Sequence, residues 1–235
     1  VLHSENKQGL TEAADRWLPR LSAHPGLTGI AGVINRQPEV KPVSIYGQLG
    51  LEEKFAEVIL RYGPECFFQV NPPQLLSVVN ELKAWFRESK PVRLLDLYAG
   101  VGTFGFLLSD LASEILAVES EPANIFYFKK NLRLNQATNI KLVAGRVEQK
   151  LKEITDFNPE VAMLDPPRQG LQPELIAELK KIPLRSIFYL SCDPATLARD
   201  LNRFRPEFEP QAIRAFDFFP RTPHLEVLTH LKRAD

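Results

Sequence analysis

Alternation of two kinds of hydrophobic pattern is the feature that most restricts the fold of this chain. From residue 93 onward, each short apolar run of strand length is followed by a segment with apolar residues at helical spacing. The strand-like runs occupy 93–98, 114–119, 140–145, 161–165 and 186–191, and the helical segments occupy 103–112, 122–134, 146–154, 172–181 and 194–204. Such alternation implies right-handed crossovers, so it predicts an α/β fold whose mostly parallel, doubly wound sheet is covered by helices on both faces.

Two further strand-like runs, near 211–218 and 225–231, would complete a seven-stranded sheet. The FPRTPH connection between them is too short for a crossover, so we expect these two strands to pair antiparallel at one edge of the sheet. This edge hairpin departs from a plain dinucleotide-binding fold.

The chain changes character near Lys90 and Pro91, where we place a boundary between a smaller amino-terminal α+β region, 1–90, and a larger domain, 91–235. In the first region the patterns predict one helix and three strands, followed by a second helix that begins at Pro72 with Asn71 as its N-cap. The predicted helix covers 8–22, and the strands cover 28–34, 43–48 and 66–70. The second helix has an apolar face that should pack on the larger domain.

Composition and charge exclude several classes of protein. The 235-residue chain has no run of about 18 apolar residues and does not begin like a signal peptide, so we expect a cytoplasmic, non-membrane protein. Its two cysteines lie far apart with no His cluster nearby, so no metal is expected. Lys plus Arg and Asp plus Glu number 29 each, so net charge gives no sign of a polyanionic partner. The chain begins at Val1, so we expect a shortened form of a longer protein, and we expect a monomer.

Residues that follow the predicted strands carry the functional signals, because ligands of doubly wound sheets bind outside the carboxyl ends of the strands. The first strand ends near Asp96 and leads into a glycine-rich turn with Gly100, Gly102 and Thr103. The second strand ends at Glu119, where a carboxylate can accept both hydroxyls of a ribose. Nicotinamide, flavin and S-adenosylmethionine proteins all use related turns.

An anion beside the turn decides between these cofactors. Asp96 would repel a pyrophosphate but would suit the ammonium group of a methionine moiety, so we predict S-adenosylmethionine as the cofactor. Two alternatives stay open: Asp96 could serve only as a helix cap or loop-bonding residue, and the protein could be a nicotinamide- or flavin-dependent oxidoreductase.

The fourth strand ends in DPPRQG, residues 165–170. Two prolines after Asp165 give a stiff extended turn that holds the carboxylate outward. Methyltransferases that act on exocyclic amines carry an aromatic ring after the two prolines, whereas Arg168 stands there in this chain. The motif therefore argues against nitrogen methylation, and the simpler interpretation is a sheet-to-helix turn that ends at Gly170.

The fifth strand ends in SCDPAT, which places Cys192 directly before a helix with Asp193 as N-cap and Pro194 at its first position. The helix dipole favours a thiolate at Cys192, although Asp193 opposes it. Cys66 is expected to be a small buried apolar residue. His224 and Glu226 lie two residues apart, so they should share one side of the last strand, either at the site or as a solvated pair.

Taken together, these motifs resemble the S-adenosylmethionine-dependent RNA 5-methyluridine methyltransferases, which act on transfer or ribosomal RNA. The resemblance spans about residues 45–233 and rests on FFQVN, LDLYAGVGTFG, AVESEPANIFYFKKN, LDPPRQGL, SCDPATLARDL and FPRTPHLEVL. It implies a class I, Rossmann-like methyltransferase that contacts its cofactor through Gln69, Tyr98, Thr103, Glu119 and Asp165. It also implies Cys192 as nucleophile, Glu226 as base, and substrate contacts from Arg168, Phe68 and His224. Family members often carry Asn at the positions of Thr103 and Asp193, and many have an amino-terminal oligonucleotide-binding domain.

The reaction implied by the resemblance is methyl transfer to carbon 5 of uracil through a covalent adduct between Cys192 and carbon 6, with Glu226 removing the carbon 5 proton. The target base must first leave its stack. Two other functions are considered. A 5-methylcytosine RNA methyltransferase usually has a second cysteine in the strand-four motif, which DPPRQG lacks, and a non-catalytic RNA-binding scaffold would keep the fold without needing Cys192 and Glu226.

Overall fold

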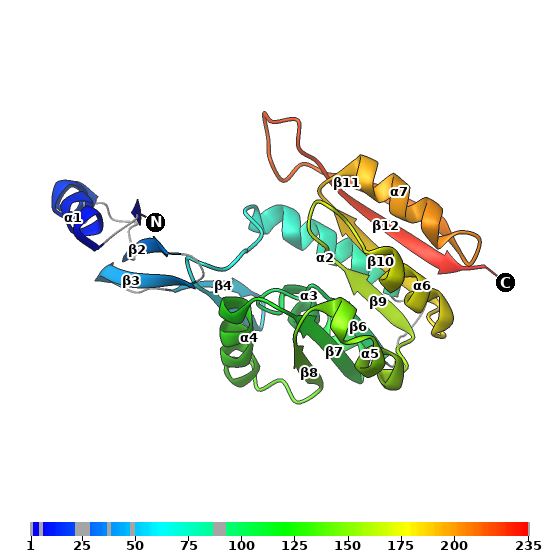
Figure 1. Ribbon diagram of the computed structural model, residues 1–235. Helices are drawn as coiled ribbons and strands as arrows, with labels where there is room; N and C mark the ends of the chain where they lie inside the picture. Colours follow the sequence, from blue (N-terminus) through cyan, green and yellow to red (C-terminus); the bar gives the residue numbers. More distant parts are fainter. Residues whose placement is uncertain are drawn as a thin grey trace.

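A computed structural model describes residues 2–4, 7–21, 29–36, 39–47, 50–86 and 93–234, with side chains for 8–10, 12–21, 50–86 and 93–234. The large sheet has seven strands in the order β11-β12-β10-β9-β6-β7-β8 (Figure 1). Five neighbouring strands, β10, β9, β6, β7 and β8, pair parallel with one another, and β12 pairs antiparallel with both β10 and β11 at one edge. The predicted α/β sheet with an antiparallel edge hairpin is therefore confirmed. The strands are β6 (Arg93–Leu97), β7 (Glu114–Glu119), β8 (Ile140–Ala144), β9 (Val161–Leu164), β10 (Ser186–Ser191), β11 (Phe208–Phe216) and β12 (Glu226–Arg233).

Helices connect the parallel strands as predicted, although two of them are shorter or displaced. They are α3 (Thr103–Leu107), α4 (Pro122–Leu134), α5 (Leu151–Phe157), α6 (Pro173–Lys181) and α7 (Pro194–Phe204). The helix predicted over 103–112 ends early because Leu108 leaves helical dihedral angles, and the chain continues as a 3-10 turn, η1 (Ser109–Leu111). The helix predicted over 146–154 starts as another 3-10 turn, η2 (Val147–Gln149), before α5 begins.

Alternate residues of the central strands point to opposite faces of the sheet and build two separate cores. Leu94 of β6 packs into one core together with α2, α3 and α4, whereas the next residue, Leu95, packs into the other with α5, α6 and α7. Helices thus cover both faces, as Figure 1 shows. This explains why these strands read as continuous apolar runs rather than as alternating ones.

Helix α2 (Pro72–Phe86) begins where the sequence predicts. The Asn71 side-chain oxygen accepts a hydrogen bond from the Gln74 backbone N–H at 3.3 Å, which is the geometry of an N-cap. Its buried residues, among them Leu75, Leu82 and Phe86, join the core on one face of the large sheet, which confirms the predicted packing. The boundary placed near residues 90 and 91 lies outside the described residues and stays a prediction.

The strand predicted over 66–70 is wrong, and a hairpin that precedes it was not predicted. Residues 66–70 have no strand partner: Phe67 and Val70 are each 64% exposed. The hairpin consists of β4 (Leu51–Phe55) and β5 (Val58–Tyr62), which pair antiparallel. Charged residues of β4 hide its strand pattern, and its turn places Ala56 at φ 52° without the Gly or Asn that marks such turns.

Two side-chain amides attach this hairpin to α4. The Asn131 side chain accepts a hydrogen bond from the Arg61 backbone N–H at 2.9 Å and donates to the Arg61 and Val101 carbonyls, both at 3.0 Å. Asn135 accepts from and donates to the backbone of Ile59, both at 2.8 Å. Each amide thus replaces a missing strand partner, and Asn131 also connects the hairpin to the glycine-rich turn.

The amino-terminal elements form their own sheet of three strands in the order β1-β2-β3. They are β1 (Leu2–Ser4), α1 (Lys7–Leu21), β2 (Gly29–Arg36) and β3 (Glu39–Gly47). The helix and two strands predicted here are confirmed in kind and approximate position, while positions 22, 28 and 48 of those predictions lie outside the described residues.

Candidate active site

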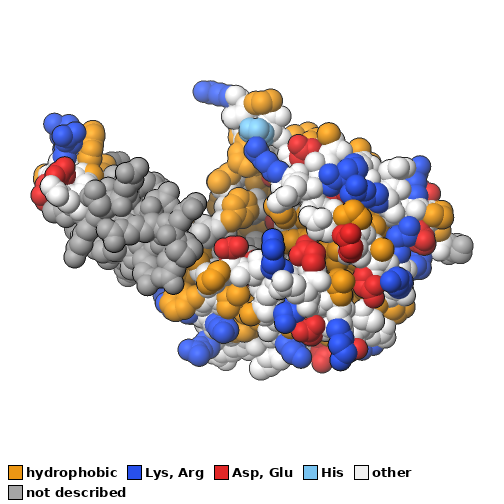
Figure 2. Space-filling view, in the orientation of Figure 1, with side chains coloured by type: hydrophobic (Ala, Val, Ile, Leu, Met, Phe, Trp, Pro, Cys, Tyr) orange, Lys and Arg blue, Asp and Glu red, His pale blue; other side chains and the backbone are white. Residues whose placement is uncertain are grey.

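A cavity of about 750 Å³ lies at the carboxyl ends of the parallel strands, which is where the doubly wound sheet was expected to bind a ligand. Figure 2 shows hydrophobic side chains along a hollow of the molecule and charged side chains of both signs near its rim. The volume falls in the range of small-molecule and cofactor sites. Predicted site residues that line the cavity are Phe68, Gln69, Tyr98, Gly100, Thr103, Glu119, Asp165, Arg168, Cys192, His224 and Glu226.

The two glycines of the turn after β6 have different roles. A Cβ added at Gly100, where φ is 58°, would meet no heavy atom within 4 Å, so this backbone is open to a ligand. A Cβ at Gly102, where φ is 96°, would come within 3 Å of the rings of Phe106 and Phe128. Gly102 does not line the cavity, and it allows close packing of the turn on the core rather than contact with a cofactor.

Glu119 is held rigidly at the end of β7. Its carboxylate accepts hydrogen bonds from the backbone N–H groups of Gly100 at 2.7 Å, Ser120 at 2.6 Å and Glu121 at 2.7 Å. A carboxylate has about four acceptor positions, so Glu119 has room for about one more donor in this arrangement. Binding both hydroxyls of a ribose would require one backbone amide to give up its bond.

Asp96 lies below the cavity rather than in its wall. It is 1% exposed, and its Oδ2 accepts a hydrogen bond from the Gly105 backbone N–H at 2.9 Å, so it serves as the loop-bonding residue that the sequence left as an alternative. Burial raises the pKa of its carboxyl to about 7, opposed by the Gly105 bond. Its Oδ1 is buried without a partner among the described residues. Asp96 is not among the residues that line the cavity, and its contact with a cofactor stays a prediction.

Gln69 and Asp165 meet across the cavity. The Gln69 side chain, 5% exposed, donates a hydrogen bond from Nε2 to Asp165 Oδ2 at 3.2 Å. The pKa of Asp165 is raised to about 8, chiefly by burial and also by the nearby charges of Glu226 and Asp96, while the Gln69 bond acts in the opposite direction. Phe68 supports this arrangement because its ring stacks on Tyr62, with centroids 4.1 Å apart.

Cys192 is half-buried and opens onto the cavity between β10 and α7. Burial raises the pKa of its thiol, and the charges of Glu226 and Asp165 act in the same direction, while a hydrogen bond from Arg168 lowers it. Asp193 is the N-cap of α7 as predicted, because it accepts from the Thr196 backbone N–H at 2.7 Å. The carboxylates that oppose a thiolate are thus Glu226 and Asp165, whereas the sequence pointed to Asp193.

Glu226 is the first residue of β12 and is 5% exposed. Burial raises the pKa of its carboxyl to about 7, and the positive charge of Arg168 lowers it. The register of the sheet places Glu226 near Cys192, because Ser191 pairs with Val227 on antiparallel strands, Cys192 directly follows Ser191, and Glu226 directly precedes Val227. Arg168 therefore acts on both groups.

The expectation that His224 and Glu226 share a side of the last strand is wrong for His224. The strand begins at Glu226, and His224 is exposed in the preceding loop, where its ring meets that of Phe219 edge to face at 6.0 Å. It still lines the cavity.

Several lining residues were missed by the sequence analysis. They include Phe67, Asn124, Arg146, Gln149, Gln172 and Phe219. Arg146 and Gln149 lie in the segment that follows the end of β8 at Ala144, where the rule that ligands bind after parallel strands points.

No group of three or more His, Cys, Asp or Glu within the described ranges could hold a metal ion. Among those same residues, no helix is both long and apolar enough to cross a membrane. The expected cytoplasmic location and monomeric state stay predictions.

The order of the seven strands, the antiparallel edge and the cavity at the strand ends define a class I, Rossmann-like methyltransferase fold. The crystal structure of a Pyrococcus abyssi tRNA (uracil-54, C5)-methyltransferase in complex with S-adenosyl-L-homocysteine superposes with a TM-score of 0.74 at 26% identity, covering 91% of this chain and 53% of that one. A Methanocaldococcus jannaschii tRNA m1G37 methyltransferase, with a TM-score of 0.63 at 15% identity and covering 100% of this chain and 71% of that one, shares the fold alone.

Residues 45–234 match the tRNA (Uracil-5-)-methyltransferase family, and the chain belongs to this family. It is 35% identical over 232 residues to an uncharacterized RNA methyltransferase of Synechocystis, which covers 95% of this chain and 49% of the relative. It is also 35% identical over 188 residues to the tRNA (uracil(54)-C(5))-methyltransferase of Pyrococcus horikoshii, which covers 80% of this chain and 44% of the relative. The chain thus spans less than half of the length of these relatives.

Proposed function

We propose that this chain transfers a methyl group from S-adenosylmethionine to carbon 5 of a uridine in RNA. The observation that carries the proposal is that Cys192, Glu226 and the glycine-rich turn with Glu119 line one cavity. A methyl donor and a pyrimidine ring can therefore lie next to each other beside a thiol. Transfer RNA is the first substrate to test, because the Pyrococcus relatives are named for uracil 54 of tRNA, and ribosomal RNA is the second.

The residues at one end of the cavity fit the methyl donor. The open backbone at Gly100 leaves room for close approach, Glu119 can accept a ribose hydroxyl, and an oxygen of the Asp165 carboxyl can accept a hydrogen bond from an ammonium group. Gln69, Tyr98 and Thr103 complete this wall. When bound, S-adenosylmethionine would supply an electrophilic methyl group on a positively charged sulfur.

The residues at the other end fit the acceptor base. Cys192, once ionised, adds its sulfur electron pair to carbon 6 of the uracil, and the ring electrons move to carbon 5, which becomes nucleophilic enough to take a methyl group. Glu226 then removes the proton from carbon 5, the double bond between carbons 5 and 6 re-forms, and sulfur leaves with its electron pair. Burial keeps the pKa of Glu226 at about 7, so it can hold and release a proton near neutral pH.

Arg168 is proposed to prepare both groups. It hydrogen-bonds the Cys192 thiol and lowers its pKa, and its charge also lowers the pKa of Glu226. The guanidinium is exposed enough to contact the flipped base or its phosphate as well, together with Phe68 and His224.

A 5-methylcytosine activity is the nearest alternative, but Cys192 is the single cysteine among the residues that line the cavity. A scaffold without catalysis would need neither the converging thiol nor the buried carboxylate. The test is to incubate the chain with unmodified transfer or ribosomal RNA and methyl-labelled S-adenosylmethionine, and then to digest the RNA to nucleosides.

Labelled 5-methyluridine is expected, with complete loss in Cys192→Ser and full retention in the matched control Cys66→Ser. Labelled 5-methylcytidine would overturn the choice of base. Normal cofactor binding without label in either RNA would favour the scaffold.

A further inference from the structure

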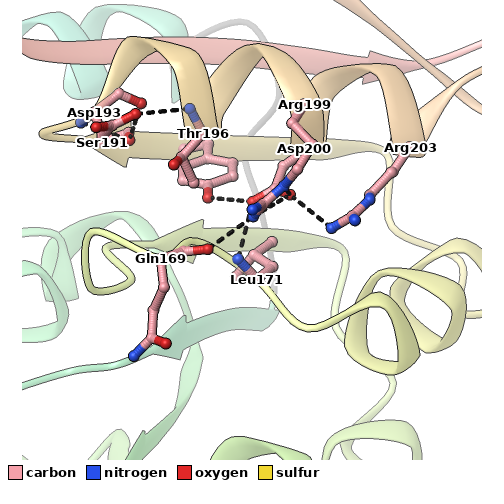
Figure 3. Close-up of polar contacts among 9 residues, drawn as sticks. Gln169, Leu171, Ser191, Asp193, Thr196, Arg199, Asp200 and Arg203 are labelled. Carbon is pink, nitrogen blue, oxygen red and sulfur yellow. Dashed lines mark hydrogen bonds and ion pairs between the residues drawn. The ribbon is translucent and has the colours of Figure 1, made fainter.

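A buried carboxylate on α7 holds the loop that follows β9. Asp200 is fully buried, and its Oδ2 accepts hydrogen bonds from the Leu171 backbone N–H and the Tyr189 hydroxyl, both at 2.9 Å (Figure 3). Its Oδ1 accepts from Arg199 Nε at 3.0 Å and from Arg203 at 3.3 Å. Both oxygens are thus fully used, which a buried charge requires.

Arg199 adds a second attachment to the same loop. Its guanidinium donates to the Gln169 carbonyl at 2.7 Å while it is also paired with Asp200 (Figure 3). Arg203 differs, because it pairs with Asp200 and donates to no atom of residues 165–171 in the described structure. We call the bonds of Asp200 and Arg199 to Gln169 and Leu171 the α7 clasp.

The loop approaches α7 so closely that only glycine fits between the two attachments. A Cβ added at Gly170, where φ is 73°, would lie 2.4 Å from Asp200 Oδ2 and 2.4 Å from the Thr196 side chain. The clasp therefore fixes the loop against the helix with little freedom to slide.

The two parts joined by the clasp carry the two partners of the proposed thiol chemistry. Arg168 directly precedes the clasped Gln169, and Cys192 lies two residues before the first residue of α7. We infer that Asp200 and Arg199 are positioning residues that hold Arg168 against the Cys192 thiol, an inference that rests on the proposed function of these two groups. Two other charged groups act on the thiol. Glu226 is the first residue of β12, and Asp165 directly follows β9.

Two substitutions separate the halves of the clasp. Arg199→Gln removes the bond to the Gln169 carbonyl at a side chain that is 42% exposed, so the fold should tolerate it. Asp200→Asn keeps the shape of the side chain, and its remaining oxygen can still accept hydrogen bonds from Leu171 and Tyr189. Its NH₂ group, however, would face the guanidinium groups of Arg199 and Arg203, which are also donors, so these two bonds would be lost. Arg203→Gln is the matched control, because it removes a pairing with Asp200 and leaves the loop attachments in place.

The experiment measures alkylation of Cys192 by iodoacetamide from pH 6 to pH 10, with the Cys192 and Cys66 peptides quantified by mass spectrometry. Alkylation follows the thiolate, so its pH midpoint reports how well Arg168 is held at the sulfur. For Arg199→Gln and Asp200→Asn we expect a midpoint about 0.5 to 1 pH unit higher, which is roughly three- to tenfold slower alkylation below the midpoint. Arg168→Gln should give at least the same shift, and Arg203→Gln should change the rate by less than about twofold.

Cys66 is the internal control in every sample, because it does not line the cavity and its alkylation should change only if the whole protein loosens. An Arg199→Gln protein with the wild-type midpoint at Cys192 would overturn the inference, and so would equal acceleration at Cys66 and Cys192. If Asp200→Asn does not fold, Arg199→Gln decides alone. Alkylation needs neither RNA nor methyl donor, so absence of 5-methyluridine would refute the proposed function without affecting this result.

Discussion

Replacing Glu226 with Gln should stabilise the protein in a way that depends on pH. The pKa of this carboxyl rises from an ordinary 4.5 to about 7 in the folded chain because it is buried. The native state therefore binds more protons than the unfolded state between these values, so the free energy of unfolding falls as pH rises through that window. At 1.36 kcal/mol per pKa unit, ionising Glu226 in the folded protein costs about 3 kcal/mol. A neutral glutamine avoids this cost.

The expected stability gain of Glu226→Gln over wild type is about 2 kcal/mol larger at pH 8 than at pH 5, because at pH 5 the native carboxyl is already protonated. Urea unfolding at both pH values measures this difference, and the melting temperature at pH 8 should rise by roughly 4 to 8 °C. The exposed Glu57, in the turn between β4 and β5, supplies the control Glu57→Gln, for which the pH effect should stay within about 0.5 kcal/mol. An equal gain at the two pH values, or a loss at pH 8, would refute the argument from burial.

Three further predictions concern the site and its support. Glu226→Gln should accumulate a covalent protein–RNA adduct at Cys192, seen as a band on a gel that resists denaturation. The reason is that proton removal from carbon 5 slows by a factor of about 10² to 10⁴, which delays release of the sulfur. A gel without that band would argue against Glu226 as the base. Gly100→Ala should cost only about 1 to 2 kcal/mol of stability, but calorimetry should detect no binding of S-adenosylmethionine to it. Gly102→Ala should lower the melting temperature far more than Gly100→Ala does. The reverse order would contradict the roles assigned to the two glycines. Asn131→Ala should lower the free energy of unfolding in urea by about 1 to 3 kcal/mol, because it leaves backbone groups of the hairpin unpaired. A change below about 0.5 kcal/mol would mean that water replaces the amide.

The sequence was sufficient for the large sheet because its central strands, such as β6, β9 and β10, are buried on both faces and therefore form continuous apolar runs. It was insufficient for the hairpin of β4 and β5, which is stabilised by Asn131 and Asn135, residues about 70 positions away in the chain. The strand predicted over 66–70 was wrong for a related reason: this segment has no strand partner, and its Phe68 and Gln69 side chains are held by contacts with Tyr62 and Asp165.

The site could be predicted to the extent that its residues follow parallel strands. This rule located Gly100, Glu119 and Cys192, all of which line the cavity. The role of Asp96 depended on side-chain direction, which periodicity at a strand end does not determine, and the charges that act on Cys192 come from Glu226 and Asp165, distant in sequence. Spatial electrostatics of this kind needs coordinates.

The reversed direction of β12 has a consequence for the spacing between the thiol and the carboxylate. In a purely parallel sheet, the ligand-binding edge receives only residues at which strands finish, but β12 begins there, and so it delivers Glu226 beside the end of β10 through a fixed ladder of backbone bonds. The loop of residues 217–225 therefore hangs outside that ladder. The spacing between the Cys192 thiol and the Glu226 carboxylate is therefore set by the backbone pairing of β10 and β12 rather than by the loop, and a slip of one residue within that pairing would turn the carboxylate to the opposite face.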